Sequence, residues 1–350
     1  MGVFRFSNAV SDIAKFINTY KTLYSELNDE PFLGHDEARD ALIRHSLVSS
    51  SGAIGNEAVN RSVRQDRSRD PLYNQLKMYS EIFRMLGWYQ PANNRTSFNF
   101  TPISEYIVEN GKNIADNIYK FNFYSIVSPN NLVNNVFNTT NRPIKSLLNL
   151  AKYADKLISR DEIILDVLTI ENDLLIDFKI LAEVTKERRF DGNKIKHDIN
   201  LLVSNEKISE TTLQNYTRFP IAGCKYVKWF NETSIKSSTT KSNLKYFQIT
   251  DEALNYHNQF ATKYDLRYSE IENFDKDIKS AFIYLMFLKN LEFIGFEIDD
   301  EETNSLINKL EASSKPIFDK INVNGSNDVF YSSVQQSKKE DFENIQNLSL

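Results

Sequence analysis

Two stretches of the sequence share one pattern and decide the predicted fold: residues 83–101, FRMLGWYQPANNRTSFNFT, and residues 224–250, CKYVKWFNETSIKSSTTKSNLKYFQIT. In each, a helical segment ends in aromatic residues, a polar turn follows, and a short extended run closes on a threonine. The runs Phe98–Thr101 and Phe247–Thr250 match, and threonine is a favoured N-cap for a following helix. The order helix, helix, hairpin, helix is thus predicted twice, which favours a fold-level duplication over a chance resemblance.

Helix signals precede the first stretch. Residues 1–48 carry apolar residues at helical spacing and predict one or two amphipathic helices, and a Ser- and Gly-rich loop follows them. A longer helix is predicted over Pro71–Leu86, because Asp70 is a suitable N-cap and proline suits the first turn. Gly87 is expected to end it.

The second half repeats this order with different lengths. Ser159 and Glu162 have the spacing of a capping box at a helix start. The further predicted segments are helices over Ile163–Leu168, Leu174–Lys186 and Phe219–Phe230, a polar turn over Ser234–Asn243, and a strand over Leu244–Ile249.

These segments predict a mainly α fold with small β-hairpins. We expect two winged-helix (helix-turn-helix) subdomains and a helical linker. The predicted parts are a first subdomain with N-terminal helices (1–140), a second subdomain (141–257), the linker (258–312), and a polar tail or a boundary to a missing module (313–350).

Composition limits the class of protein. At 350 residues, with a formal net charge of −5, the chain is long enough for two or three domains and is not basic throughout. The longest apolar run, residues 281–288, is too short to span a bilayer, and no signal peptide is visible, so we expect a cytoplasmic protein without a membrane partner. The single cysteine and four scattered histidines give no zinc-ligand spacing.

A first basic cluster precedes the predicted helix at Pro71. It comprises Arg61, Arg64, Arg67 and Arg69 and is interrupted by Asp66 and Asp70. The first turns of a recognition helix enter the major groove, where arginine pairs with guanine and asparagine with adenine. The residues expected to reach DNA here are Arg64, Arg67, Arg69, Tyr73, Asn74 and Lys77. The alternative is a solvated loop of Arg–Asp pairs.

A second basic cluster lies between residues 218 and 245. It has six basic residues against one acidic residue, Glu232, and small hydroxyl residues surround its lysines. A hairpin of this kind would lie along the phosphate backbone as a wing. Its members are Arg218, Lys225, Lys228, Lys236, Lys241 and Lys245. The alternative is a flexible Lys- and Ser-rich loop that only keeps the protein in solution.

The sequence offers no good match to a known catalytic motif. The chain has no nucleotide-binding glycine motif, and Cys224 has no obvious base partner. A metal-dependent nuclease needs carboxylates and a lysine clustered around a divalent ion. The nearest match, Asp173 with Asp177 and Lys179, falls in a predicted helix. We therefore assign no catalytic residue, metal ligand or cofactor to this chain.

Three segments resemble the DNA-recognition half of modular type IIS restriction endonucleases and their nicking relatives. They are Lys77–Ile107 (KMYSEIFRMLGWY with FNFTPISEYI), Ser146–Thr169 (SLLNLAKYADKLISRDEIILDVLT) and Cys224–Thr250 (CKYVKWF with KYFQIT). The resemblance implies tandem winged-helix subdomains that read an asymmetric site, followed by a helical linker and a separate nuclease module. The family's carboxylate–lysine nuclease motif is not found here, so Mg²⁺ is expected only in an associated nuclease domain or subunit.

The sequence therefore predicts sequence-specific recognition of double-stranded DNA in the service of restriction. Two alternatives stay open: a winged-helix transcriptional regulator, which would bind a palindrome as a symmetric dimer, and a protein-interaction scaffold whose lysines only contact solvent.

Overall fold

The first quoted stretch folds into a helix, a tight turn and a hairpin. Helix α4 (Pro71–Met85) begins where the Asp70 carboxylate accepts hydrogen bonds from two backbone N–H groups of the first turn. It ends before Gly87, whose φ of 75° suits glycine and is costly for other residues. Strand β4 (Tyr89–Pro91) then pairs antiparallel with β5 (Ser97–Phe100). The predicted N-cap and the predicted terminator are both confirmed.

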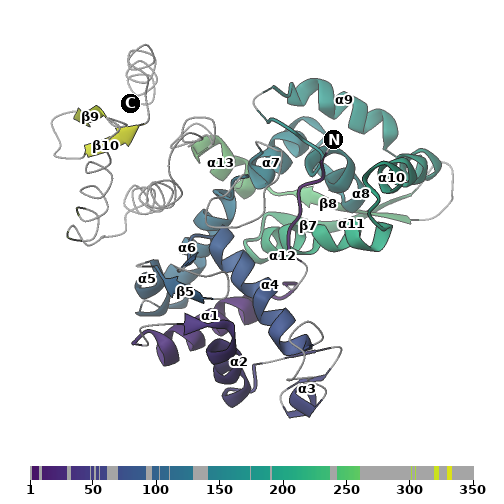
Figure 1. Ribbon diagram of the computed structural model, residues 1–350. Helices are drawn as coiled ribbons and strands as arrows, with labels where there is room; N and C mark the ends of the chain where they lie inside the picture. Colours follow the sequence, from purple (N-terminus) through teal and green to yellow (C-terminus); the bar gives the residue numbers. More distant parts are fainter. Residues whose placement is uncertain are drawn as a thin grey trace. The chain divides into compact units, whose positions relative to one another are not determined.

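These elements complete a first structural repeat (Figure 1). Its other elements are α1 (Ile13–Leu27), β1 (Leu33–Gly34), α2 (His35–Arg44), β2 (Ser49–Ser50), β3 (Ala53–Ile54), α3 (Asn56–Asn60) and α5 (Ile103–Glu109). The three-stranded sheet has the order β1–β5–β4, and β2 pairs with β3 in a separate small hairpin. Helix α2 packs against both α1 and α4, and α5 packs against α1.

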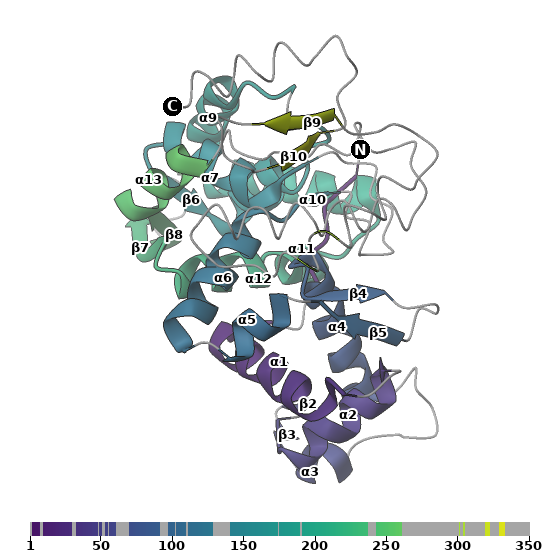
Figure 2. The ribbon, with the colours of Figure 1, turned by 90° about the vertical axis from the view of Figure 1, so that its left-hand side faces the viewer.

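A second repeat follows the same order with a larger insertion. Its elements are α7 (Pro143–Tyr153), β6 (Leu157–Ser159), α8 (Arg160–Glu162), the π-helical turn η1 (Ile163–Val167), α9 (Phe178–Arg188), α10 (Gly192–Glu206), α11 (Glu210–Tyr216), α12 (Arg218–Tyr226), β7 (Phe230–Lys236), β8 (Asn243–Ile249) and α13 (Asp251–Phe260). Its sheet order, β6–β8–β7, corresponds to β1–β5–β4. In Figure 2 the purple and blue elements of the first repeat lie together, as do the teal and green elements of the second.

In each repeat we call the helix before the hairpin the third helix: it is α4 in the first repeat and α11 with α12 in the second. The same hydrogen bonds, which we call the tryptophan clasp, join this helix to the hairpin in both repeats. Trp88 and Trp229 are fully buried, and each backbone N–H donates over 2.8 Å to the helix carbonyl five residues earlier. Each tryptophan carbonyl accepts the N–H of the threonine that ends the hairpin, Thr101 at 3.1 Å or Thr250 at 3.0 Å. The residue before each tryptophan is left-handed, a glycine in the first repeat and Lys228 (φ 60°) in the second. The chain thus contains two copies of one topology.

The second helix, α2 in the first repeat and α8 with η1 in the second, begins in the same way in both repeats. A helix begins directly after β1 and directly after β6. At these points the N–H of Gly34 donates to the Glu37 carboxylate over 3.0 Å, and the N–H of Ser159 donates to the Glu162 carboxylate over 2.7 Å. The capping box predicted at Ser159 and Glu162 is confirmed.

The third helix is continuous in the first repeat and broken in the second. Counted back from the clasp, α11 and α12 together correspond to α4. They meet at Thr217, and Pro220 lacks the N–H that would bond to the carbonyl of Tyr216. The break therefore has a local cause, and the corresponding positions can still be counted across it.

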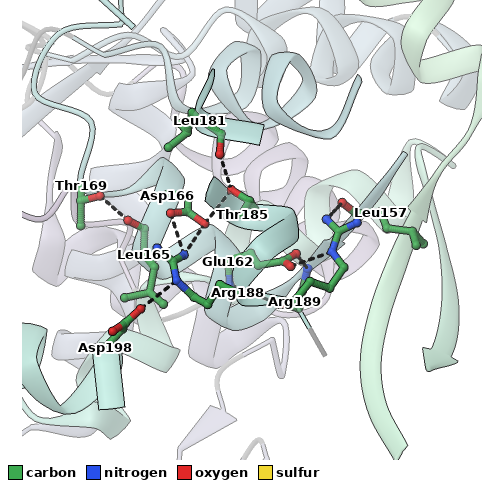
Figure 3. Close-up of polar contacts among 11 residues, drawn as sticks. Leu157, Glu162, Leu165, Asp166, Thr169, Leu181, Thr185, Arg188, Arg189 and Asp198 are labelled. Atoms are coloured by element: carbon green, nitrogen blue, oxygen red, sulfur yellow. Dashed lines mark hydrogen bonds and ion pairs between the residues drawn. The ribbon is translucent and has the colours of Figure 1, made fainter. Parts of the chain in front are cut away.

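Buried ion pairs tie the insertion of the second repeat to its second helix (Figure 3). Arg188 bridges Asp166 at 2.7 Å and Asp198 at 2.8 Å, and Arg189 pairs with Glu162 at 2.9 Å. Burial raises the pKa of Glu162 and of Asp166, and the arginine beside each opposes that rise. Because each buried carboxylate has its own arginine, the network joins these helices through paired charges.

The N-terminal segment, residues 2–7, connects the third helices of the two repeats. Arg5 pairs with Glu81 on α4 at 3.3 Å, and the Phe6 ring lies 5.6 Å from the Phe219 ring on α12. The third helices therefore lie on either side of one short segment.

Helix α6 (Lys112–Tyr124) also packs against α12. A Cβ atom at Gly223 would lie 2.5 Å from the ring of Phe123, so only glycine fits there. Tyr226 donates a hydrogen bond to Asp116 on α6. The close approach explains why this buried position in α12 has no side chain.

The computed structural model describes residues 2–7, 10–29, 33–47, 49–50, 53–54, 56–60, 70–91, 97–101, 103–109, 111–128, 141–173, 175–189, 191–236, 243–260, 301, 304, 319–322 and 329–332. The chain divides into two units, residues 1–263 and 264–350. The second unit contains an antiparallel hairpin, β9 (Asp319–Asn322) and β10 (Val329–Ser332). This hairpin falls within the predicted tail or module boundary, residues 313–350, and most of the predicted linker, residues 258–312, lies outside the described residues.

Several predicted ends of helices and strands are wrong. Helix α9 begins at Phe178, because the Asp177 carboxylate caps it. Helix α12 ends at Tyr226, since the left-handed Lys228 directs the chain into β7, and that strand extends to Lys236 within the predicted turn. Residues 163–167 form a π-helical turn where an α-helix was predicted. The predicted class, mainly α with small β-hairpins, is confirmed.

Candidate nucleic-acid interface

The third helix of the first repeat presents a narrow polar stripe to solvent. Asn74 is partly exposed and Lys77 is exposed, and residues three apart lie on the same face of a helix. Glu81 continues the stripe and is held by Arg5. Asn74 and Lys77 thus have the exposure that contact with DNA requires.

Tyr73 does not reach the surface. Its side chain is 9% exposed, and its ring meets the His35 ring edge-on at 5.6 Å. The expectation that Tyr73 is exposed to reach DNA is wrong, because α2 covers this side of α4. The periodicity of α4 alone does not reveal that second covered side.

The third helix of the second repeat carries a longer stripe. Arg218 and Lys225 are exposed and lie seven residues apart, which places them on one side of α12. Asn215 lies on α11, three residues before Arg218, and is partly exposed. It was not predicted from the sequence as a contact residue. The tryptophan clasp identifies this residue, because counting the same number of residues back from Trp88 and from Trp229 matches Asn74 with Asn215.

Lys225 is already engaged within the protein. It forms an ion pair with Glu232 on β7, and its Nζ lies 5.4 Å from the centroid of the Phe247 ring. The hydrogen bond from Lys225 lowers the pKa of the Glu232 carboxyl, and the charges of Lys225 and Lys245 add to this effect. An exposed pair of this kind stabilises by at most about 1 kcal/mol, so a phosphate can compete for the lysine. The one acidic residue in the cluster is therefore satisfied locally.

The remaining described cations of this cluster lie on the hairpin and at the start of α12. Lys228 stands in the turn before β7, Lys236 ends β7, and Lys245 lies on β8 opposite Ser234. Lys236 and Lys245 belong to the same face of the hairpin, because side chains alternate along a strand and this pairing register puts both on one side. With Arg218 they are exposed and form no ion pair with any described residue.

A groove of about 620 Å³ separates the hairpin from helices α8, α10, α11 and α12. Polar side chains of Gln214, Ser234 and Lys245 line it, and Ile195 and Ile221 contribute apolar surface. Burial also raises the pKa of Asp161 in its wall, and the nearby Glu210 adds to the rise. The groove thus combines the cations Arg160, Lys225 and Lys245 with the carboxylates of Asp161 and Glu232 and with apolar surface, and its donors could contact phosphates or base edges.

Four predicted contact residues, Arg64, Arg67, Arg69 and Lys241, lie outside the described residues. The others stand on the two third helices and on the β7–β8 hairpin, with Tyr73 buried.

The carboxylates considered for catalysis have structural roles. Asp173 pairs with Arg142 at 2.6 Å, and Asp177 caps α9. Burial raises the pKa of the Cys224 thiol well above its usual range, so the thiolate nucleophile is disfavoured. Within the described ranges, no group of three or more His, Cys, Asp or Glu side chains is placed to hold a metal ion, and no helix is long and apolar enough to cross a bilayer.

No family model matches the sequence, and no curated protein matches it. Two solved structures show a distant similarity. One is the restriction endonuclease FokI, with a TM-score of 0.39 and 14% identity over 100% of this chain and 68% of that chain. The other is FokI bound to DNA, with a TM-score of 0.39 and 10% identity over 99% of this chain and 68% of that chain. Similarity at this level shows neither a family nor a function for this chain.

Proposed function

We propose that this chain recognises double-stranded DNA by sequence, through two winged-helix units, as the recognition part of a type II restriction endonuclease of the IIS kind. One observation carries the proposal: each of two repeats of the same topology exposes amide and basic side chains on its third helix, beside a hairpin. In a winged helix, the third helix enters the major groove and the hairpin follows the backbone.

The charge distribution supports the same reading. The whole chain has a net charge of −5, yet Arg218, Lys228, Lys236 and Lys245 gather on one helix and its hairpin. Only the contacting surface of a DNA-binding protein must be positive, and phosphate contacts supply most of its affinity. A hairpin whose exposed lysines share one face meets that requirement.

The restriction part of the proposal rests on the sequence resemblance. Cleavage would come from a nuclease domain or subunit that the described residues do not provide, and Mg²⁺ would act there. Two unlike third helices in one chain favour an asymmetric site. A regulator that bound as a symmetric dimer would protect a palindrome instead, so the symmetry of the footprint separates these functions.

Selection from a random duplex pool tests the function directly. We expect one asymmetric sequence to be enriched, with an affinity that falls steeply as salt rises. Replacing Lys236 and Lys245 together by alanine should lower the slope of log affinity against log salt by about 2, whereas Lys112→Ala on α6 should leave it unchanged. Failure to enrich any sequence would overturn the proposal, and an unchanged slope in the double variant would favour the scaffold alternative.

A further inference from the structure

The two third helices carry the same pair of side-chain types at corresponding positions. Lys77 and Arg218 each lie ten residues before the left-handed residue of the clasp, and Asn74 and Asn215 each lie three residues before that cation. We infer that these two pairs read the same kind of base step, so the target contains two copies of an adenine–guanine step, one under each third helix. This inference rests on the proposed DNA recognition.

The correspondence is structural as well as sequential. The clasp fixes the end of each third helix with matching hydrogen bonds, so a count from it gives equivalent places on α4 and on α11–α12. Both asparagines are partly exposed, and both cations are exposed. The neighbouring positions have diverged: the buried Tyr73 corresponds to Gln214, and Glu81 corresponds to Ala222. Shared chemistry is therefore concentrated at the two positions that face solvent one turn apart.

The side-chain chemistry determines the bases. An asparagine amide makes two hydrogen bonds with the N6 and N7 edge of adenine, and arginine or lysine donates to O6 and N7 of guanine. Three residues span about 4.5 Å along a helix, which is near the roughly 3.4 Å between neighbouring base pairs. Asn74 and Lys77 can thus contact adjacent base pairs from one face of α4. Asn215 and Arg218 lie on either side of the α11–α12 junction and keep a similar spacing, because Thr217 between them has dihedral angles in the right-handed helical region (φ −88°, ψ −9°).

The connection between the repeats bounds the spacing of the two steps. Both third helices contact the N-terminal segment, α4 through the Arg5–Glu81 pair and α12 through the Phe6–Phe219 contact. Helices tied to one short segment cannot engage distant parts of a duplex. We therefore expect both steps within about one turn of DNA, on the order of ten base pairs.

The two pairs also differ in a way that can be tested. Arg218 has a planar fork that matches guanine with two parallel hydrogen bonds, whereas Lys77 is a flexible point charge. The second helix should discriminate guanine more strongly than the first. Lys77→Arg should sharpen the guanine preference in the first step, and Arg218→Lys should relax it in the second while keeping the charge.

The experiment repeats the random-pool selection with four variants, Asn74→Ala, Lys77→Ala, Asn215→Ala and Arg218→Ala, after circular dichroism has verified that each is folded. We expect each variant to lose about ten- to hundredfold discrimination at one base pair, adenine for the asparagines and guanine for the cations. Lys236→Ala is the matched control, because loss of a phosphate contact should weaken binding to all sequences equally.

Two results would overturn the inference while leaving the proposed function intact. The wild-type chain could enrich a single sequence that lacks two adenine–guanine steps, or the Asn215 and Arg218 variants could keep every base preference. If the wild-type chain enriched no sequence, the proposed function would fail first and this inference with it. The outcomes are distinguishable, because the wild-type selection is read before the variants.

Discussion

The two repeats reach the same clasp by different connections between their second and third helices. The first uses a small hairpin and the short helix α3, whereas the second inserts the long helices α9 and α10. In the first, Arg39 on α2 pairs at 3.3 Å with Asp70, the cap of the third helix. In the second, Arg189 at the end of α9 pairs with Glu162 on the second helix. The sheet order and the clasp thus define the topology, and the connection between those helices is free to vary provided that its charges are paired.

The largest expected effect comes from breaking the connection of the second repeat. Arg189 and Glu162 each have a side chain that is 1% exposed, and Arg189 also donates to the carbonyls of Ala154 and Leu157. Arg189→Met would leave a buried carboxylate without its partner, which costs about 3–5 kcal/mol of unfolding free energy. Chemical denaturation measures this loss.

Two further variants test whether the unpaired Glu162 charge causes the loss of stability in Arg189→Met. Lys186→Met removes an exposed pair with Glu183 and should lower the unfolding free energy far less than Arg189→Met does. Adding Glu162→Gln to Arg189→Met should recover part of the loss, since glutamine removes the buried charge and can still serve in the capping box. A double variant no more stable than Arg189→Met would mean that the lost carbonyl contacts, and not the stranded charge, dominate.

A pH effect of intermediate size distinguishes the first residues of the two second helices. His35 is buried and Arg160, its counterpart, is exposed. Burial, together with the positive charges of Arg84 and Lys77 and against the opposing charge of Asp36, lowers the pKa of His35 from 6.5 to about 4. The unfolded chain therefore binds a proton that the folded chain resists. Stability from this residue is fully present above pH 6.5 and is lost as the pH falls towards 4, by at most about 3 kcal/mol.

His35→Leu isolates this contribution. Unfolding free energies at pH 7, 5.5 and 4 should fall less steeply in the variant than in the wild type, although carboxylates titrate over the same range in both. The contribution of His35 is the difference between the slopes of unfolding free energy against pH in the wild type and in the variant. Identical slopes would show that His35 becomes protonated without loss of the fold, and the contrast with Arg160 would then have no energetic meaning.

Signals at chain reversals and helix starts predicted much of the fold. The caps at Asp70 and Ser159, the terminator at Gly87 and the matching runs that end in Thr101 and Thr250 are all local, and each is confirmed as a structural feature. Local hydrogen bonds of this kind depend on residues a few positions apart, so a single sequence is sufficient to find them.

Contacts between distant segments were not predictable in this way. Strands β1 and β6 are only two and three residues long, and they form because a hairpin some 60 to 90 residues later offers an edge. The burial of Tyr73 depends on α2, and the Lys225–Glu232 pair depends on the bend that Lys228 introduces. The sequence therefore predicted most of the residue types of the candidate interface, whereas the match of Asn215 to Asn74 depends on counting residues back from the two clasps.

The smallest expected effect concerns the left-handed residue of each clasp, glycine in one repeat and lysine in the other. Both N–H groups donate over 3.0 Å to the carbonyl three residues earlier, so the backbone geometry is shared. A left-handed conformation costs a non-glycine residue about 1–2 kcal/mol, partly offset by the greater entropy that glycine loses on folding. Lys228→Gly should stabilise the second repeat by about 0.5–1 kcal/mol, and Gly87→Ala should destabilise the first by about 1 kcal/mol, both measured by denaturation.

If Lys228 contacts phosphate, the same Lys228→Gly variant should bind DNA more weakly and with a salt slope lower by about 1. A gain in stability together with a loss in affinity would show that lysine is kept there for binding at the expense of the backbone, whereas a loss of stability would mean that its side chain packs on the hairpin and that the two clasps differ in more than this residue.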